Sequence, residues 1–186
     1  MSDFEIKDGV LIKYNGNEEH IVISEGVTEI GTGAFRGCKS LAEVSIPNSV
    51  TEIGVEAFEG CDSLAEVSIP NSVTKIGDRA FWECDSLAEV SIPNSVTEIG
   101  AGAFEGCKSL DNVVIPDGVL KIECAAFSGC SSLESVSIPE SVAKIGKWAF
   151  YRCTSLTSVA IPEDAEIDEE AFLGCPFHKS KDKEII

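Results

Sequence analysis

The sequence predicts a repeat solenoid, in which successive turns of the chain stack into one elongated domain. The segment SLAEVSIPNSVT occurs unchanged at residues 40–51, 63–74 and 86–97, which gives a period of 23 residues. Apolar residues recur at the same interval over most of the chain. A unit of this size cannot enclose a core alone, whereas stacked units bury each apolar position against its own copies. We therefore expect parallel strands on one side of the stack and irregular segments on the other.

Each repeat begins with a short strand. In LAEVSI, Val67 and Ile69 point to one side while Glu66 and Ser68 point to the other, which is the alternation of a half-buried strand. Pro70 ends the strand because it has no N–H to extend the ladder. The buried positions recur as columns of leucine, valine and isoleucine that begin at Leu41, Val44 and Ile46.

The remainder of each repeat contains a second extended piece and a compact segment. SVTEIG is short and closed by glycine, and AFEGC is too short for more than a turn or two of helix. We expect short strands, turns and short helical segments on this side. The compact segment contains a recurring phenylalanine, found at Phe35, Phe58, Phe81, Phe104, Phe127, Phe150 and Phe172.

The chain divides into three parts. Residues 1–23 contain Asp8-Gly9 and Asn15-Gly16 between alternating apolar runs, which are hairpin signals, so we predict an N-terminal β-hairpin cap. Residues 24–175 hold about seven repeats. Residues 176–186 are expected to form a C-terminal cap followed by a polar tail.

The cysteines also follow the repeat. A residue that recurs once per turn stacks on its copies with parallel side chains, a geometry that disfavours disulfides. We therefore expect a ladder of buried thiols, with Cys124 outside it, exposed and reactive. The cysteines lack the CxxC grouping of a zinc site. The ladder consists of Cys38, Cys61, Cys84, Cys107, Cys130, Cys153 and Cys175.

The pattern L-x-x-V-x-I-P-x-S-V-x-x-I-G-x-x-A-F-x-x-C resembles the BspA-like leucine-rich repeat, also called the Treponema pallidum type, from about Ile23 to Cys175. The resemblance implies a right-handed leucine-rich-repeat superhelix with its parallel sheet on the concave face and the turns on the convex face. It also implies a bacterial protein involved in adhesion or protein binding, often at the cell surface. The first residues lack the basic and apolar regions of a secretory signal, so we expect a cytoplasmic protein or a mature fragment of a secreted one.

Composition and motifs argue against several functions. The 14 basic and 32 acidic residues give a net charge of −18, which repels nucleic acid and anionic membranes. No apolar run is long enough for membrane insertion. His20 and His178 both lie outside the repeats, and no nucleotide-binding motif is present. We predict no catalytic residues, no cofactor and no metal.

The outward positions of the concave strands form the first candidate binding site. Glu43, Glu66 and Glu89 are expected to stack at a spacing of about 4.8 Å, forming an acidic strip. This strip suits a basic or polar protein partner. Weak Ca²⁺ binding and a purely solubilising role after repeat duplication are the alternatives. The candidate residues are Glu43, Glu66, Glu89, Ser45, Ser68, Ser91, Asp111, Asn112 and Glu134.

Departures from the repeat mark a second candidate site on the convex face. Aromatic residues and arginine are favoured anchors of protein interfaces. Such a patch would bind a partner or a second copy of the chain, or it would simply cover the edge of the core. The candidate residues are Trp82, Trp148, Tyr151 and Arg152.

We therefore predict a non-catalytic protein-binding or scaffolding module that presents a rigid acidic concave surface to a protein partner. Two alternatives stay open. One is a structural protein that self-associates. The other is a consensus-like engineered repeat scaffold, although the divergence of the repeats toward the C-terminus favours a natural origin.

Overall fold

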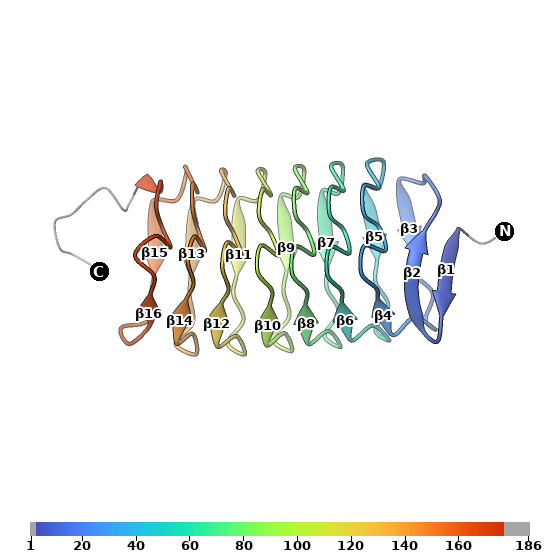
Figure 1. Cartoon of the computed structure of the whole chain (residues 1–186), viewed down its shortest axis with the longest axis horizontal. Coiled ribbons are helices and arrows are strands. Elements are labelled where there is room, and N and C mark those ends of the chain that lie inside the picture. The colour runs from blue at the N-terminus through green and yellow to red at the C-terminus, as the bar shows by residue number, and fades with distance from the viewer. Residues whose placement is uncertain (1–2, 177–186) are drawn as a thin grey trace.

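The computed structural model describes residues 3–176. These residues form a β-solenoid of about seven turns that lie side by side along one long axis (Figure 1). The predicted solenoid fold is thereby confirmed. Within the described range, the chain forms no helix with the length and hydropathy that crossing a bilayer requires. Most of the predicted polar tail, residues 177–186, lies outside the described residues.

One side of the solenoid is a parallel sheet of seven strands, which we call the long sheet. Neighbouring strands pair in the register of the repeat, so that Val44 lies opposite Val67, and Val67 opposite Val90. These valines are buried in the core, whereas the residues on either side of each are exposed. The strands are β3 (His20–Val22), β5 (Glu43–Ser45), β7 (Glu66–Ser68), β9 (Glu89–Ser91), β11 (Asn112–Val114), β13 (Ser135–Ser137) and β15 (Ser158–Ala160).

A second side is built from two-residue strands, with one isoleucine of each buried in nearly every repeat. These strands belong to two separate sheets, because the ladder stops after β10 and resumes at β12. The first of these sheets contains β4 (Glu29–Ile30), β6 (Glu52–Ile53), β8 (Lys75–Ile76) and β10 (Glu98–Ile99). The second contains β12 (Lys121–Ile122), β14 (Lys144–Ile145) and β16 (Glu166–Ile167).

An antiparallel hairpin of β1 (Phe4–Lys7) and β2 (Val10–Tyr14) covers the first turn, and β2 pairs in parallel with β4. The hairpin turn lies at Asp8-Gly9, where both residues have positive φ, as a two-residue hairpin turn of this type requires. Asn15-Gly16 forms no second hairpin. After Gly16 the chain crosses to β3, which lies within the range predicted as a cap but is already a strand of the long sheet.

The third side, which we call the turn side, carries the Ala-Phe segments. We expected short helical segments there, but each segment is a succession of tight turns. Backbone N–H groups alternate in direction along it. Ala57 and Glu59 donate to carbonyls three residues back, whereas Phe58 donates to Ala80 in the next repeat at 2.7 Å. A helix would direct every N–H along the segment, so the bonds between repeats exclude it.

The core consists of ladders of identical side chains. The phenylalanine rings from Phe35 to Phe172 stack nearly parallel, with neighbouring centroids 4.9–5.4 Å apart. The predicted thiol ladder is also confirmed, since all eight cysteines are free, those of the ladder are buried except the half-buried Cys38, and Cys124 is exposed. The thiol of Cys61 donates to the carbonyl oxygen of Phe35 at 3.2 Å, and the later repeats copy this bond.

Candidate functional site

The three glutamates of the acidic strip are the first residues of β5, β7 and β9. Strand register places Glu43 directly opposite Glu66, and Glu66 opposite Glu89. All three side chains are exposed. The period of the repeat therefore places like charges side by side at a strand spacing of about 4.8 Å, which is mildly repulsive while the carboxylates remain solvated.

A shallow open hollow of about 540 Å³ lies over β5, β7 and β9. It brings together five of the predicted residues, and Asn48 and Asn71 join them from the turns that follow β5 and β7. The sequence shows these asparagines as a repeated column next to the prolines, which is the signal that identifies them. The predicted residues in the lining are Glu43, Glu66, Ser45, Ser68 and Ser91.

The other predicted residues lie on the same face but do not line the hollow. Glu89 and Asn112 continue the row of Glu66, because β9 pairs with β11 in register. Asp111 and Glu134 lie just before β11 and β13 and are exposed. The candidate residues thus form a continuous face, and the hollow lies over its N-terminal half.

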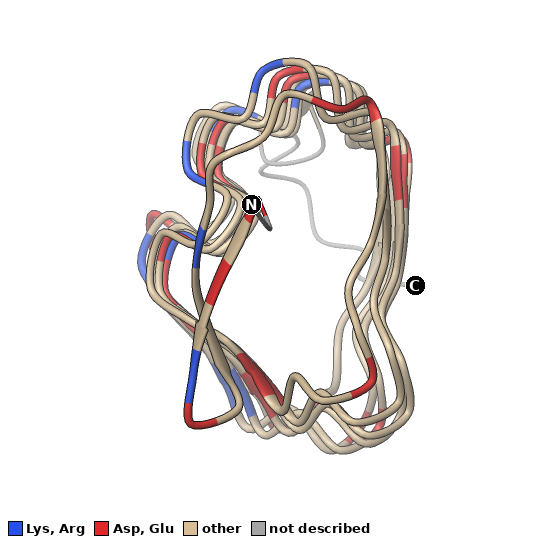
Figure 2. Ribbon diagram, turned by 90° about the vertical axis from the view of Figure 1, so that its right-hand side faces the viewer, with Lys and Arg blue, Asp and Glu red and all other residues tan. Residues whose placement is uncertain are grey.

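The charged residues of this face, apart from a histidine, are all acidic. We call this surface the acidic face, and it consists of the side chains that point outward from seven segments, namely 18–27, 41–50, 64–73, 87–96, 110–119, 133–142 and 156–165. These segments contain no lysine and no arginine. In Figure 2, the right-hand side formed by the long sheet accordingly shows acidic but no basic residues. The exposed acidic residues are Glu18, Glu19, Glu25, Glu43, Glu66, Glu89, Asp111, Asp117, Glu134, Glu140, Glu163 and Asp164.

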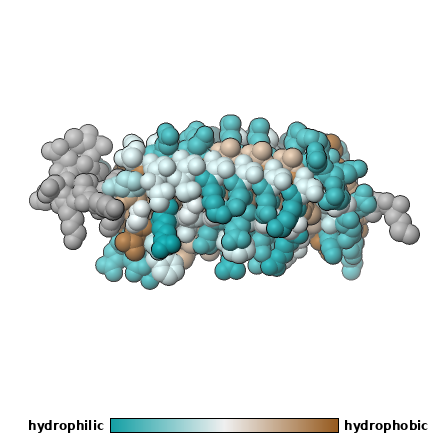
Figure 3. All heavy atoms as spheres, turned by 90° about the horizontal axis from the view of Figure 1, so that it is seen from above, coloured by the Kyte–Doolittle hydropathy of each residue, from teal (hydrophilic) through white to brown (hydrophobic). Residues whose placement is uncertain are grey.

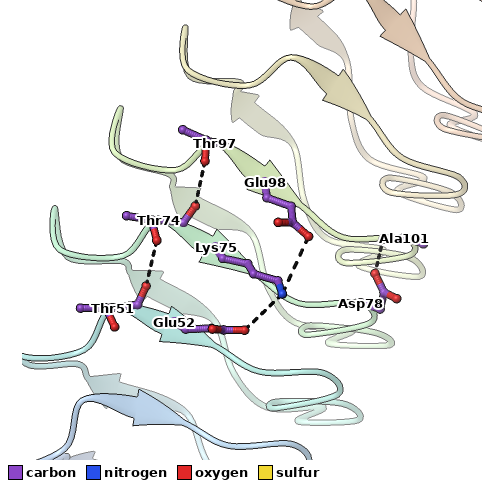
Figure 4. Close-up of polar contacts among 8 residues, drawn as sticks. All are labelled: Thr51, Glu52, Thr74, Lys75, Asp78, Thr97, Glu98 and Ala101. Carbon is purple, nitrogen blue, oxygen red and sulfur yellow. Dashed lines mark hydrogen bonds and ion pairs between the residues drawn. The ribbon is translucent and has the colours of Figure 1, made fainter.

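The second side of the solenoid shows the opposite arrangement. There Lys75 lies between Glu52 and Glu98, at 3.4 and 3.9 Å from their carboxylate oxygens (Figure 4). Thr74 next to it donates to the carbonyl oxygen of Thr51 at 3.4 Å, so this side is also joined by side-chain hydrogen bonds. Acidic residues are therefore neutralised within the protein on this side. On the acidic face, by contrast, Glu66 and Glu89 form no ion pair with any described residue.

His20 forms a side-chain contact with the acidic strip that was not predicted from the sequence. It is opposite Glu43 in the pairing of β3 with β5, and its Nδ1 lies 3.1 Å from a carboxylate oxygen of Glu43. Both side chains are exposed. Cys124, the exposed cysteine outside the ladder, follows β12 and lies several repeats along the solenoid from β3. The structure therefore does not bring the two together.

Metal binding would need converging ligands. Within residues 3–176, no three histidine, cysteine, aspartate or glutamate side chains are grouped so that they could hold a metal ion. The acidic residues of the strip follow one another along a line instead. His178 lies outside the described residues.

The residues of the convex candidate site lie on the turn side. The Trp148 and Tyr151 rings are 6.2 Å apart, and the guanidinium of Arg152 lies 5.0 Å from the centre of the Tyr151 ring. Trp82 is three repeats away, where Arg79 lies over its ring at 5.9 Å. The candidate site is therefore not one patch but two aromatic clusters, separated by repeats four and five.

The top of the molecule, as seen in Figure 3, carries mainly hydrophilic residues with small hydrophobic areas. An interface at the top of the molecule would therefore rely on polar contacts rather than on a large buried apolar area.

Comparison with known proteins gives a consistent result. A family model described as a BspA type leucine-rich repeat region matches residues 6–122 and 97–182, in six copies. A Treponema pallidum leucine-rich repeat protein of known structure is 35% identical, with a TM-score of 0.87 over 91% of this chain and 81% of that one. No curated protein matches the sequence.

Two further solved structures are similar. A leucine-rich repeat protein from Bacteroides ovatus is 35% identical, with a TM-score of 0.81 over 84% of this chain and 41% of that one. One from Eubacterium ventriosum is 26% identical, with a TM-score of 0.85 over 97% of this chain and 49% of that one. The chain thus spans less than half the length of these two relatives. The repeat columns, the solenoid and these matches together show that the chain belongs to the BspA-type leucine-rich repeat family.

Proposed function

We propose that this protein is a non-catalytic protein-binding module whose acidic face binds a basic surface of a protein partner. The observation that supports this most strongly is the segregation of charge. The lysines and arginines in the described repeats lie on the other sides, where most form ion pairs with acidic residues, whereas the acidic face has none. A face of one sign attracts and orients a partner of the opposite sign.

The rigidity of the face supports the same proposal. Hydrogen-bonded strands hold the outward side chains at fixed spacing, and a continuous core lies beneath them. Such a surface binds with little change in shape, so a partner loses less free energy to ordering than it would on a flexible loop. The relatives named above come from bacteria, and we propose a bacterial protein with an adhesion-type role.

Capture from a bacterial lysate on the immobilised protein tests this function. We expect basic proteins to be retained at low ionic strength and to elute as salt is raised toward about 0.5 M, because exposed charges are then screened within a few ångströms. Retention of acidic or neutral proteins only, with no dependence on salt, would contradict the proposal.

A further inference from the structure

The turn side carries a trough between the two aromatic clusters. In each repeat, the residue after the core phenylalanine lies on the turn side, where Trp82 and Tyr151 hold that position in repeats three and six and are half-buried. Glu105 and Ser128 hold it in the two repeats between. Hollows of about 260 and 450 Å³ open here, and both are lined by Glu105, Ser128 and Tyr151. Trp82 lines the first of them and Trp148 the second.

The two neighbouring rows of positions also carry small residues in repeats four and five, counting the repeat that contains Phe35 as the first. Gly102 and Ala125 lie between Arg79 and Trp148 in one row. In the other row, two glycines lie between larger side chains, in the order Glu83, Gly106, Gly129 and Arg152. Small residues thus form the floor over two adjacent repeats, and large residues form a wall at each end.

The walls are built from residues in a strained backbone conformation. Two positions in each of the first six repeats adopt the left-handed region, which glycine adopts without strain. Both positions carry side chains only in repeats three and six, at Arg79 and Glu83 and at Trp148 and Arg152, with φ between 53° and 60°. Such residues destabilise the fold by about 1–2 kcal/mol each, and strain of this kind concentrates at ligand-binding sites.

The side chains in the walls include aromatic residues and arginines, which are favoured anchors of binding interfaces. Trp82 and Trp148 are the only two tryptophans of the chain. Arg79 and Arg152 form no ion pair with any described residue, whereas the third arginine, Arg36, pairs with two glutamates. Their guanidinium groups lie over the aromatic rings of the walls, with their N–H groups available to a ligand.

The charge of the trough is balanced, unlike that of the acidic face. Lys147 pairs with Glu170 at its rim, at 3.4 Å. The remaining charges are two arginines and two glutamates, namely Arg79, Arg152, Glu83 and Glu105. A cationic ligand would find a stronger field on the acidic face, and an anionic one would meet the overall charge of −18. A neutral ligand with many hydrogen-bonding groups fits this trough best.

We propose that the trough binds a neutral oligosaccharide. The aromatic rings would pack against the C–H faces of sugar rings, while the arginines and Glu105 would exchange hydrogen bonds with hydroxyl groups. Three repeat spacings of about 4.8 Å separate Trp82 from Tyr151, which is a length that a short oligosaccharide spans. This site is independent of the proposed protein-binding face.

Tryptophan fluorescence provides a direct test, because both tryptophans lie in the walls. The protein is first screened on an array of neutral glycans, and the best-bound oligosaccharide is then titrated in solution. We expect a saturable change in fluorescence, with the Kd raised at least tenfold by Trp82→Ala and by Tyr151→Ala. Leu120→Ala, an exposed apolar residue elsewhere, is the matched control and should leave the Kd unchanged. Circular dichroism confirms that each variant folds.

Further variants distinguish the alternatives. Glu105→Gln should raise the Kd for a neutral sugar only a few-fold, and the triple change Glu43→Lys, Glu66→Lys, Glu89→Lys should not affect it. Absence of binding across the array would overturn the proposal. So would tight binding of hexalysine that Glu105→Gln abolishes, which would indicate a cationic peptide. A concentration-dependent oligomer lost in Trp148→Ala would instead assign the trough to self-association.

Discussion

Glu123 occupies the position that Gly100 holds one repeat earlier, and the backbone ladder of the second side is interrupted between these two residues. A Cβ atom on Gly100 would lie 2.5 Å from the backbone nitrogen of Asp78, and one on Gly77 would lie 2.7 Å from the backbone of Gly54. The stacked repeats therefore leave no room for a side chain at these two glycines. Glu123 brings a side chain to this position and the sheet divides there, whereas Asp168, which holds the same position in the last repeat, still donates its amide N–H to the carbonyl of Ile145 at 3.0 Å.

Replacing this glutamate should repair the ladder. In Glu123→Gly, the amide at position 123 can donate to the carbonyl of Ile99, as Gly100 donates to Ile76 at 2.9 Å in the intact part. We expect the free energy of unfolding to rise by about 1 kcal/mol, the net value of one buried hydrogen bond. Urea unfolding measures this value, and hydrogen exchange should show new protection of amide 123. An unprotected amide in a folded variant would contradict the explanation.

The converse change tests the same contact. Gly77→Ala should lower the free energy of unfolding by about 1–3 kcal/mol, because its Cβ collides with backbone that cannot move independently. Gly26→Ala is the matched control, since no atom lies within 4 Å of its added Cβ. The control should change stability by less than about 0.5 kcal/mol.

The wall residues with positive φ should make the protein less stable than glycine would at the same positions. Glu83 has a φ of 54° where five other repeats have glycine, so Glu83→Gly should raise the free energy of unfolding by up to about 1 kcal/mol. Urea unfolding at a single pH is sufficient. Gly60→Glu, the reverse change one repeat earlier, should lower stability by a similar amount. Equal stabilities of both variants and the native protein would argue against strain at this position.

The thiol ladder predicts a division in reactivity. Burial raises the pKa of the Cys61, Cys84 and Cys107 thiols, so they remain protonated, and a thiol reagent cannot reach them without local unfolding. Native protein should therefore show one fast-reacting thiol, Cys124, and the variant Cys124→Ser should lack the fast phase. Titration with a chromogenic disulfide reagent measures this. Rapid reaction of many thiols in the folded state would contradict the buried ladder.

Glu105 predicts a pH-dependent difference in stability. Partial burial raises the pKa of its carboxyl, against a smaller lowering by Arg79 and by the hydrogen bond from Ser128. The folded state thus holds the proton more tightly than the unfolded state. Its favourable contribution is fully present below the unfolded pKa of about 4.3 and is lost as pH rises through the folded value.

Glu105→Gln removes the charge at all pH values. We expect the variant to be more stable than the native protein at pH 7, with a difference that shrinks toward pH 4. Thermal unfolding at both pH values measures it. Glu134→Gln, on the exposed acidic face, is the control and should show a smaller change between the two pH values. A difference for Glu105→Gln that grows as pH falls would show that the carboxylate is stabilising.

Much of the fold can be predicted from the sequence because each ladder consists of the same residue type repeated at the same interval. The strand at Glu66–Ser68, the buried phenylalanines and the thiols are set by that period. The interruption at Glu123 could not be predicted from the loss of a glycine from its column, because Asp168 also replaces that glycine and its ladder is intact. What the period cannot show is the direction of backbone N–H groups, and these decide that the Ala-Phe segments form turns rather than helix.

The candidate site divides in the same way. The alternation in LAEVSI is sufficient to place Glu43, Glu66 and Glu89 outward in one row. The absence of basic residues from the whole face is equally visible in the sequence once the strands are placed. The trough could not be predicted from the sequence, because it depends on the small residues of repeats four and five lying between Trp82 and Tyr151 in space.

Binding by the acidic face is tested most directly by comparing three forms of the protein in parallel capture from one lysate, read by quantitative mass spectrometry. They are the native protein, the acidic-face variant Glu43→Lys, Glu66→Lys, Glu89→Lys, and a control variant Glu5→Lys, Glu98→Lys, Glu169→Lys with the same change in net charge. If the acidic face binds the partner, the native and control proteins should retain a basic partner that the acidic-face variant loses. Equal retention by all three folded proteins, or equal loss from both variants, would contradict it.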